Sequence, residues 1–129
     1  MKTSPTIFRR LTILAGAAHA AAAIAGPAAA QDVAAGNTAF AQCAACHSVD
    51  DTNGVGPSLK GVVGRQAGTF PGFRFSRAMK GFNKPWDEKI LDAYLTNPQA
   101  AVPGNIMPFS GVTDAKERAD IIAYLKTLK

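Results

Sequence analysis

The chain has 129 residues, and its 14 Lys and Arg residues exceed its 9 Asp and Glu residues. Three of the basic residues and none of the acids lie in the first thirty positions, so the rest of the chain carries 11 basic and 9 acidic residues. So small an excess argues against a nucleic acid or an anionic membrane surface as the partner. The length allows one small domain after a leader.

Residues 1–30 have the pattern of a secretory signal peptide. They open with three basic residues, Lys2, Arg9 and Arg10. An apolar, alanine-rich run at 11–24 follows, and 28–30 is an A-x-A cleavage site. The alternative, a retained membrane anchor, is disfavoured because a membrane-spanning helix needs ~20 mostly apolar residues. We expect cleavage after residue 30, a mature domain at 31–129 in the periplasm, and no stable membrane insertion.

Residues 32–48 are predicted to form a helix, with small residues first and Phe40 as the one large apolar side chain. Gly36 lies four positions before Phe40, on the same helix face. A glycine inside a helix costs about 1 kcal/mol relative to alanine. Either Gly36 lets a second helix approach closely, or it lies at a frayed helix start, and the pattern leaves both possibilities open.

Both cysteines of the chain stand in the sequence Cys43-Ala44-Ala45-Cys46-His47, which also holds the only histidine after position 30. This spacing is typical of a c-type haem, bound through two thioether bonds and ligated by the histidine. A redox dithiol expects a βαβ setting, a structural zinc site needs four ligands, and a disulfide across so short a loop would stabilise little. We therefore predict one haem c per chain, with His47 as an axial iron ligand.

Residues 50–75 are dense in Gly and Pro and lack the alternation of strands, which predicts a long loop wrapped around a bound group. No acid lies between Asp51 and Asp87. The basic residues in this interval are Lys60, Arg65, Arg74, Arg77, Lys80 and Lys84. We expect most of them to be solvated, and one or two to reach the haem propionates, because uncompensated charge is costly in a low-dielectric site.

Two more helices are predicted in the second half of the chain. The first covers 86–97, and the second runs to Lys129 from Thr113, which we expect to be its N-cap. Both carry acids in the first turn, as the helix dipole favours. The apolar face of the first comprises Ile90, Leu91, Tyr94 and Leu95, and that of the second comprises Ile121, Ile122, Tyr124, Leu125 and Leu128.

Between these helices, residues 102–109 form a turn-rich apolar loop in which Met107 stands between Pro103 and Pro108. With one histidine in the mature chain, the second axial position is left to a methionine, a lysine or no protein ligand. The proline-stiffened loop favours Met107, and Met79 is the alternative. A closed His/Met site raises the reduction potential and discourages oxygen activation, so it favours electron transfer over bond chemistry.

From about residue 35 to 128 the chain resembles the class I cytochromes c, through the C-x-x-C-H motif, the Gly36/Phe40 pair, the Gly56-Pro57 loop and Met107. The resemblance implies an all-α cytochrome c fold with three main helices and Gly/Pro-rich loops around one covalent haem. It implies that Gly36 and Phe40 pack against Ile121 and Tyr124. It also implies a soluble one-electron carrier, and not an enzyme, acting between respiratory or photosynthetic redox complexes.

The resemblance further implies a set of haem-binding residues beyond the ligands, namely Pro57, Arg65, Trp86 and Tyr94. The carbonyl of Pro57 would accept a hydrogen bond from His47, Arg65 and Trp86 would lie on the propionate side, and Tyr94 would donate to the methionine sulfur. Three positions depart from the family pattern. Phe75 replaces a propionate-bonding tyrosine, Met79 a buried asparagine, and Asn105 a threonine.

The implied partners are redox proteins of unknown identity, bound by a monomer. Lysines that surround the exposed haem edge in mitochondrial members are replaced here by uncharged residues, Gln42, Gln99, Ala100, Ile106 and Thr113. We therefore expect docking at that edge to depend more on apolar contact than on charge. Whether the basic stretch steers a partner from another side is open. The alternative functions are a gas-binding or peroxidatic haem protein with a labile sixth ligand, and an electron-relay subunit of an enzyme complex.

Overall fold

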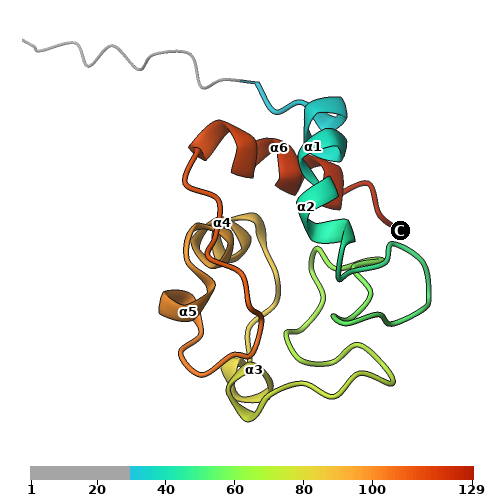
Figure 1. The fold of residues 1–129 in the computed structure, drawn as a ribbon, viewed down its shortest axis with the longest axis vertical. Helices are drawn as coiled ribbons and strands as arrows, with labels where there is room; N and C mark the ends of the chain where they lie inside the picture. The colour runs from blue at the N-terminus through green and yellow to red at the C-terminus, as the bar shows by residue number, and fades with distance from the viewer. Residues whose placement is uncertain (1–29) are drawn as a thin grey trace, which may run out of the picture.

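The computed structural model describes residues 30–129, so the expected signal peptide lies outside the described residues except for its last position. In this part of the chain the predicted all-α class is confirmed, since six helices form and the single bridge, between Gln66 and Pro85, belongs to no strand. The helices are α1 (Val33–Ala39), α2 (Ala41–Ala44), α3 (Arg77–Phe82), α4 (Glu88–Thr96), α5 (Pro98–Ala101) and α6 (Ala115–Leu125). Figure 1 shows α1 and α6 together at one end and α3 at the other.

The crossing of α1 and α6 holds together the end of the molecule that contains these two helices. A Cβ atom on Gly36 would lie 1.9 Å from the carbonyl oxygen of Asp120 and 3.0 Å from the Cβ of Tyr124, so only glycine allows this approach. The rings of Phe40 and Tyr124 pack with centroids 5.1 Å apart. The N–H of Asp32 donates to the Asp120 carboxylate at 2.8 Å. Gly36 therefore serves close helix crossing, which the sequence pattern had left open.

The helix containing the attachment motif is shorter than predicted. Instead of continuing to residue 48, it is interrupted at Phe40 and ends at Ala44. The N–H of His47 still donates to the carbonyl of Cys43, at 2.9 Å, so a final turn carries the histidine beyond the helix. His47 is consequently set by a turn and a loop.

The other two predicted helices begin later than expected because aspartates cap them. Asp87, and not a residue before it, accepts from the N–H of Ile90 at 2.8 Å and starts α4. Asp114, and not Thr113, is the N-cap of α6, where its carboxylate accepts from the N–H of Glu117 at 2.7 Å. An aspartate in this place also interacts favourably with the helix dipole.

Two short helices, α3 and α5, were not predicted, because six and four residues are too few to show a periodic pattern. Each has its own local signals. Ser76 caps α3 and Asn83, in a left-handed conformation with φ of 50°, ends it. Asn97 caps α5, with Pro98 at its first position. Of the two, α3 carries Met79, which packs against the hydrophobic core, and α5 directly precedes the loop at 102–109.

Candidate haem site

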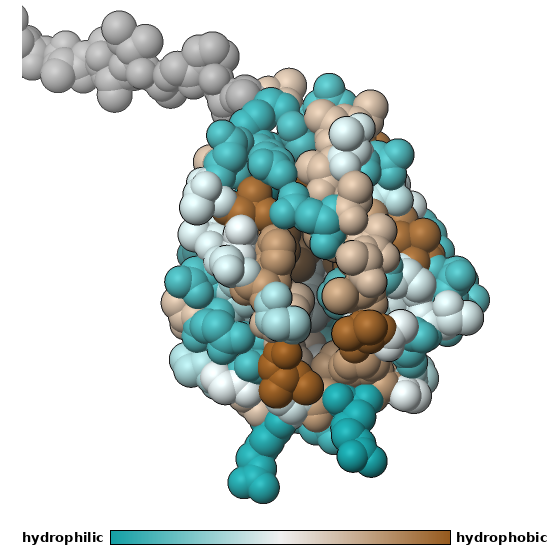
Figure 2. Space-filling model, in the orientation of Figure 1, coloured by the Kyte–Doolittle hydropathy of each residue, from teal (hydrophilic) through white to brown (hydrophobic). Residues whose placement is uncertain are grey.

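A cavity of about 470 Å³ lies in the middle of the domain. Figure 2 shows the surface hollowed at the centre of one face. Voids larger than a water molecule are rare in protein cores, so a space of this size is room for a large bound group. Its wall is mainly apolar and includes buried side chains from four parts of the chain, among them Phe40, Trp86, Leu91, Leu95 and Ile121.

The side chains predicted to bind and ligate a haem line this one cavity. They are Cys43, Cys46, His47 and Met107. The two cysteines are free thiols and form no disulfide. Burial, together with the nearby Glu117 carboxylate, raises the pKa of the Cys43 thiol to about 11. A reactive dithiol needs a lowered pKa, whereas an uncharged thioether suits a buried position, so the residues fit a c-type haem.

The proximal side, defined as residues 43–59, holds His47 through backbone groups. The Nδ1 atom of His47 lies 2.7 Å from the carbonyl oxygen of Pro57, so Nδ1 carries the proton and Nε2 is free to bind iron. The N–H of Gly56 donates to the carbonyl of Cys46 at 2.8 Å. A Cβ atom on Gly56 would lie 2.5 Å from Cε1 of His47. The ring is therefore confined by the loop that faces it.

The distal side, defined as residues 98–109, holds Met107 through side chains. The amide nitrogen of Asn105 donates to the carbonyls of Pro98 and Val102, at 2.8 and 2.9 Å. Its amide oxygen accepts from the N–H of Met107 at 2.9 Å. Asn105 is only 7% exposed, so these bonds are shielded from water. The Gln99 amide adds longer bonds of 3.3 Å to the carbonyls of Asn105 and Met107. The buried amide of Asn105 is thus the main polar group that holds the loop carrying the methionine.

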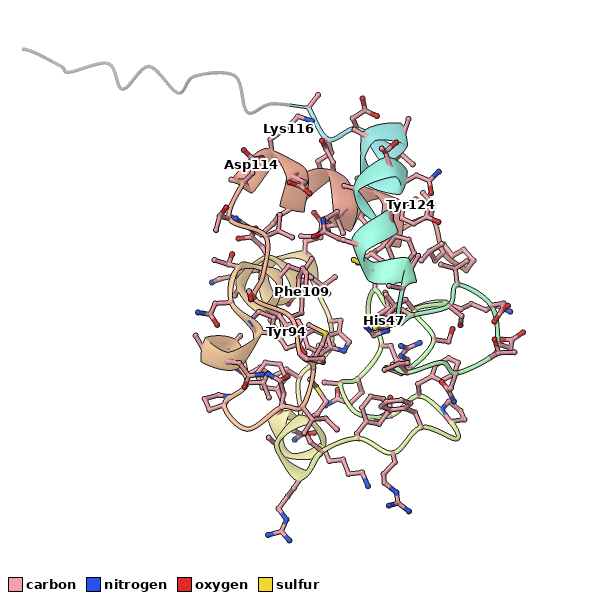
Figure 3. All side chains as sticks on the ribbon, in the orientation of Figure 1. His47, Tyr94, Phe109, Asp114, Lys116 and Tyr124 are labelled. Atoms are coloured by element: carbon pink, nitrogen blue, oxygen red, sulfur yellow. The ribbon has the colours of Figure 1, made fainter. Side chains whose placement is uncertain are left out.

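Tyr94, on α4, reaches the same methionine. Its hydroxyl donates to the sulfur of Met107 at 3.8 Å. Burial raises the pKa of Tyr94 to about 12, which keeps the phenol protonated and able to donate. Figure 3 shows His47 on one side of the central space, with Tyr94 and Phe109 on the other.

Met79, the alternative ligand, also lines the cavity, so the structure brings both mature methionines to the site. It lies on α3 and packs against the hydrophobic core as a partly buried side chain. Its backbone N–H donates to the hydroxyl oxygen of Ser76, the N-cap of α3, at 3.0 Å. The hydrogen bond from Tyr94 to the Met107 sulfur distinguishes the two residues and favours Met107.

Of the six basic side chains between positions 60 and 84, all in the described part of the chain, Arg65 alone lines the cavity. Its guanidinium donates to the carbonyls of Ser58 and Lys60, at 2.9 and 2.6 Å, and lies 4.6 Å from the centroid of the Phe70 ring. Burial lowers the pKa of Arg65, but an arginine stays charged in proteins. Of these six, Arg65 is thus the basic side chain that lies at the cavity, and its pairing with a propionate stays a prediction.

Two aromatic residues complete this part of the wall. Trp86 is buried, with its ring centroid 4.9 Å from that of Tyr94. Phe75, where the family pattern has a tyrosine, lines the cavity and packs edge-to-face against Phe73. The apolar ring of Phe75 therefore supplies packing at a position where a hydroxyl would supply a donor.

Sequence reasoning missed two polar residues that shape the loops. One is Asn105, noted only as a departure from the family pattern. The other is Ser58, which is fully buried, donates to the carbonyl of Asp50 and accepts from the N–H of Lys60 at 3.1 Å. Short polar side chains inside Gly/Pro-rich loops often bond nearby backbone groups, and that was the available signal.

Comparison with known proteins gives a consistent result. Residues 33–129 match the family model for cytochrome c. The chain is 50% identical over 101 residues to cytochrome c2 of Rhodomicrobium vannielii, covering 77% of this chain and 81% of that protein. It is also 50% identical over 86 residues to the c-type cytochrome cy of Rhodobacter capsulatus, covering 67% of this chain but only 43% of that protein.

A solved structure is similar as well. The cytochrome cH from Methylobacterium extorquens superposes with a TM-score of 0.72 and 52% sequence identity, covering 74% of this chain and 98% of that chain. Among residues 30–129, no helix has the length and apolar character that crossing a membrane requires.

Proposed function

Because this chain belongs to the cytochrome c family, we propose that it carries single electrons on a c-type haem attached to Cys43 and Cys46 and ligated by His47 and Met107. The observation that carries this proposal is that all four side chains line one cavity. When bound there, the haem supplies a one-electron iron couple whose potential the methionine raises. The function is that of an electron carrier and not of an enzyme.

The surrounding residues tune the site without taking part in bond chemistry. The Pro57 carbonyl fixes the tautomer and orientation of His47, and Tyr94 supports the Met107 sulfur. The apolar wall keeps water from the site, which controls the potential. Arg65 provides the positive charge for a buried propionate, and Trp86 lines the same cavity.

The ligand assignment can be tested with the ferric protein. Methionine ligation gives a sulfur-to-iron charge-transfer band near the red end of the visible spectrum, and we expect Met107→Ala to abolish it while Met79→Ala retains it. Survival of the band in Met107→Ala would show that the assignment is wrong. Absence of the band from the unmodified protein would instead favour a gas-binding or peroxidatic site with a labile sixth position.

We further propose that residues 1–30 are a cleaved signal and that the mature chain acts in the periplasm as a monomer, exchanging electrons with redox proteins. The basic start, apolar run and A-x-A site support export. Mass spectrometry of the protein from a periplasmic extract should give a chain that begins at Gln31. A membrane-bound chain that begins at Met1 would contradict this. Elution of the native protein with an enzyme, and not as a monomer, would favour the relay-subunit alternative.

A further inference from the structure

One asparagine of the chain is followed by glycine. The residues that follow the five asparagines are Thr38, Gly54, Lys84, Pro98 and Ile106. The amide of asparagine is thermolabile, because the backbone nitrogen of the next residue can attack it. Glycine hinders this attack least, since it has no Cβ atom and the widest choice of backbone angles, whereas threonine and isoleucine are branched at Cβ and proline has no N–H. The Asn53-Gly54 pair therefore holds the chemically weakest side-chain amide of the chain.

In the folded protein both groups that would react are engaged in hydrogen bonds. The side-chain oxygen of Asn53 accepts from the N–H of Ser58 at 3.1 Å, and its side-chain nitrogen donates to the carbonyl of Pro71 at 3.0 Å. The N–H of Gly54 donates to the carbonyl of Gly56 at 3.0 Å. Attack requires the Gly54 nitrogen to lose its proton and the Asn53 side chain to turn toward it. These three bonds must therefore break first.

The loop that carries this pair, at 50–58, is a place where local opening is expected. Asn53 and Gly54 are exposed, and the loop is closed by Ser58, which is fully buried and donates to the carbonyl of Asp50. Segments that few contacts hold open at lower free energy than the rest of a domain. In Figure 1 the loops that follow α2 lie on the side of the molecule opposite to α4 and α5. Opening of this loop would thus release Asn53 while the helices stay folded.

We propose that Asn53 is a deamidation site whose reaction is controlled by opening of the loop at 50–58. When the loop opens, the deprotonated nitrogen of Gly54 attacks Cγ of Asn53. The N–Cγ bond forms, the Cγ–Nδ2 bond breaks, and Nδ2 leaves as ammonia with a proton from water. Water then adds to one carbonyl carbon of the succinimide ring and opens it, which leaves aspartate or isoaspartate at position 53. Water is the only co-reactant.

The product changes the loop that faces His47. A carboxylate at position 53 cannot donate to the carbonyl of Pro71, and isoaspartate adds a carbon atom to the backbone immediately before Gly54. Two residues further on, the N–H of Gly56 donates to the carbonyl of Cys46 at 2.8 Å. Deamidation therefore loosens the segment that confines the proximal histidine.

Peptide mass spectrometry of the haem-loaded protein, incubated at mildly alkaline pH, tests the site. The internal control is Asn83, which is followed by Lys84. In guanidinium, where no loop is formed, we expect Asn53 to deamidate about 10-fold faster than Asn83. In the folded protein Asn53 should react about 10-fold more slowly than in guanidinium, because the loop must open first. A higher rate at Asn83 in guanidinium, or equal rates at Asn53 in both conditions, would overturn the proposal.

Two variants separate opening of the loop from unfolding of the domain. S58A removes the bond from Ser58 to the Asp50 carbonyl, and its matched control, S76A, removes the side chain that accepts from the N–H of Met79 at the start of α3. We expect S58A to raise the rate at Asn53 in the folded protein about 5-fold, and S76A by less than about 2-fold. An equal rise in both variants would assign the reaction to unfolding of the whole domain and would overturn control by the loop.

Hydrogen exchange of the unmodified protein answers the same question even if S58A does not fold. The backbone amide of Gly54 should exchange at a lower opening free energy than that of Leu91 in α4, since the loop opens while the helix stays folded. Exchange of both amides at one opening free energy would overturn local opening of the loop.

Discussion

The proximal and distal sides of the cavity hold their iron-facing side chains by different means. On the proximal side His47 follows directly after Cys46, and its ring is hydrogen-bonded to the Pro57 carbonyl. The backbone of Gly56 lies close against the ring and restricts its movement. On the distal side Met107 sits on a loop whose shape depends on the side chain of Asn105. The proximal ring is held by backbone groups, whereas the distal loop is held by side chains, chiefly the Asn105 amide, with Gln99 and Tyr94 as further donors.

This difference implies unequal stability. Loops that depend on few contacts open at lower free energy than the rest of a domain. The proximal histidine has several independent constraints, so the loss of one leaves others in place. We therefore expect that weakening the distal loop releases Met107 from the iron before the helices unfold, whereas weakening the proximal side lowers the stability of the ligation and of the helices together. The predictions below test that difference.

The largest effect is expected from Gly56→Ala on the proximal side. The new Cβ would lie 2.5 Å from Cε1 and 2.8 Å from Nδ1 of His47, and neither the ring nor the loop can yield easily. We expect the free energy of unfolding of the haem-loaded protein to fall by about 2 to 3 kcal/mol. Guanidinium unfolding followed by circular dichroism measures this, and the charge-transfer band should disappear at the same denaturant concentration as the helices.

Gly81→Ala is the matched control for this substitution. A Cβ atom on Gly81, in α3, meets nothing within 4 Å, and its φ is not positive. Alanine there should raise the free energy of unfolding by about 0.5 to 1 kcal/mol, since it favours the helix. Equal losses in both variants would mean that contact with the His47 ring is not the cause.

A smaller effect with a different signature is expected from Asn105→Ala on the distal side. The change removes two hydrogen bonds to backbone carbonyls and the acceptor of the Met107 N–H in a buried place. We expect a cost of about 2 kcal/mol, confined mainly to the distal loop. The charge-transfer band should then be lost at clearly lower denaturant concentration than the helical circular dichroism signal.

Asn53→Ala provides the same substitution in the proximal region. Asn53 also makes two backbone bonds, accepting from the N–H of Ser58 at 3.1 Å and donating to the carbonyl of Pro71 at 3.0 Å, but it is exposed. We expect a loss of less than about 1 kcal/mol, with the band and the helices lost together. If Asn105→Ala also lost both signals together, the distal loop would not be the weaker side.

The main helices were predictable from sequence because their signals are local and periodic. Leu91, Tyr94 and Leu95 recur at helical spacing, and all three are buried. The start of α6 could not be predicted to the residue, since Thr113 and Asp114 are both good caps. Arg118 decides between them in the fold, because it binds the carbonyls of Val112 and Thr113 and keeps them outside the helix.

In the candidate site, too, some features were predictable from sequence and others were not. The attachment motif and His47 could be read from spacing, because the chemistry that joins them lies within five consecutive residues. The role of Asn105 could not be read from sequence spacing. Its partners include the carbonyl of Pro98, seven residues away, whose position depends on α5. The choice of Met107 over Met79 came from its prolines, yet both methionines reach the cavity. That choice stays a prediction.

The smallest effect is expected from Tyr94→Phe, which removes the second support of Met107 but leaves the Asn105 bonds in place. Sulfur is a weak acceptor and the contact is 3.8 Å long, so the hydroxyl should contribute less than about 1 kcal/mol to methionine ligation. The ferric protein should keep its charge-transfer band, with a slightly lower denaturant midpoint. In the double variant with Asn105→Ala the two losses should not add, because both act on one side chain. Loss of the band in Tyr94→Phe alone would make the hydroxyl, and not the Asn105 amide, the main support of the distal side.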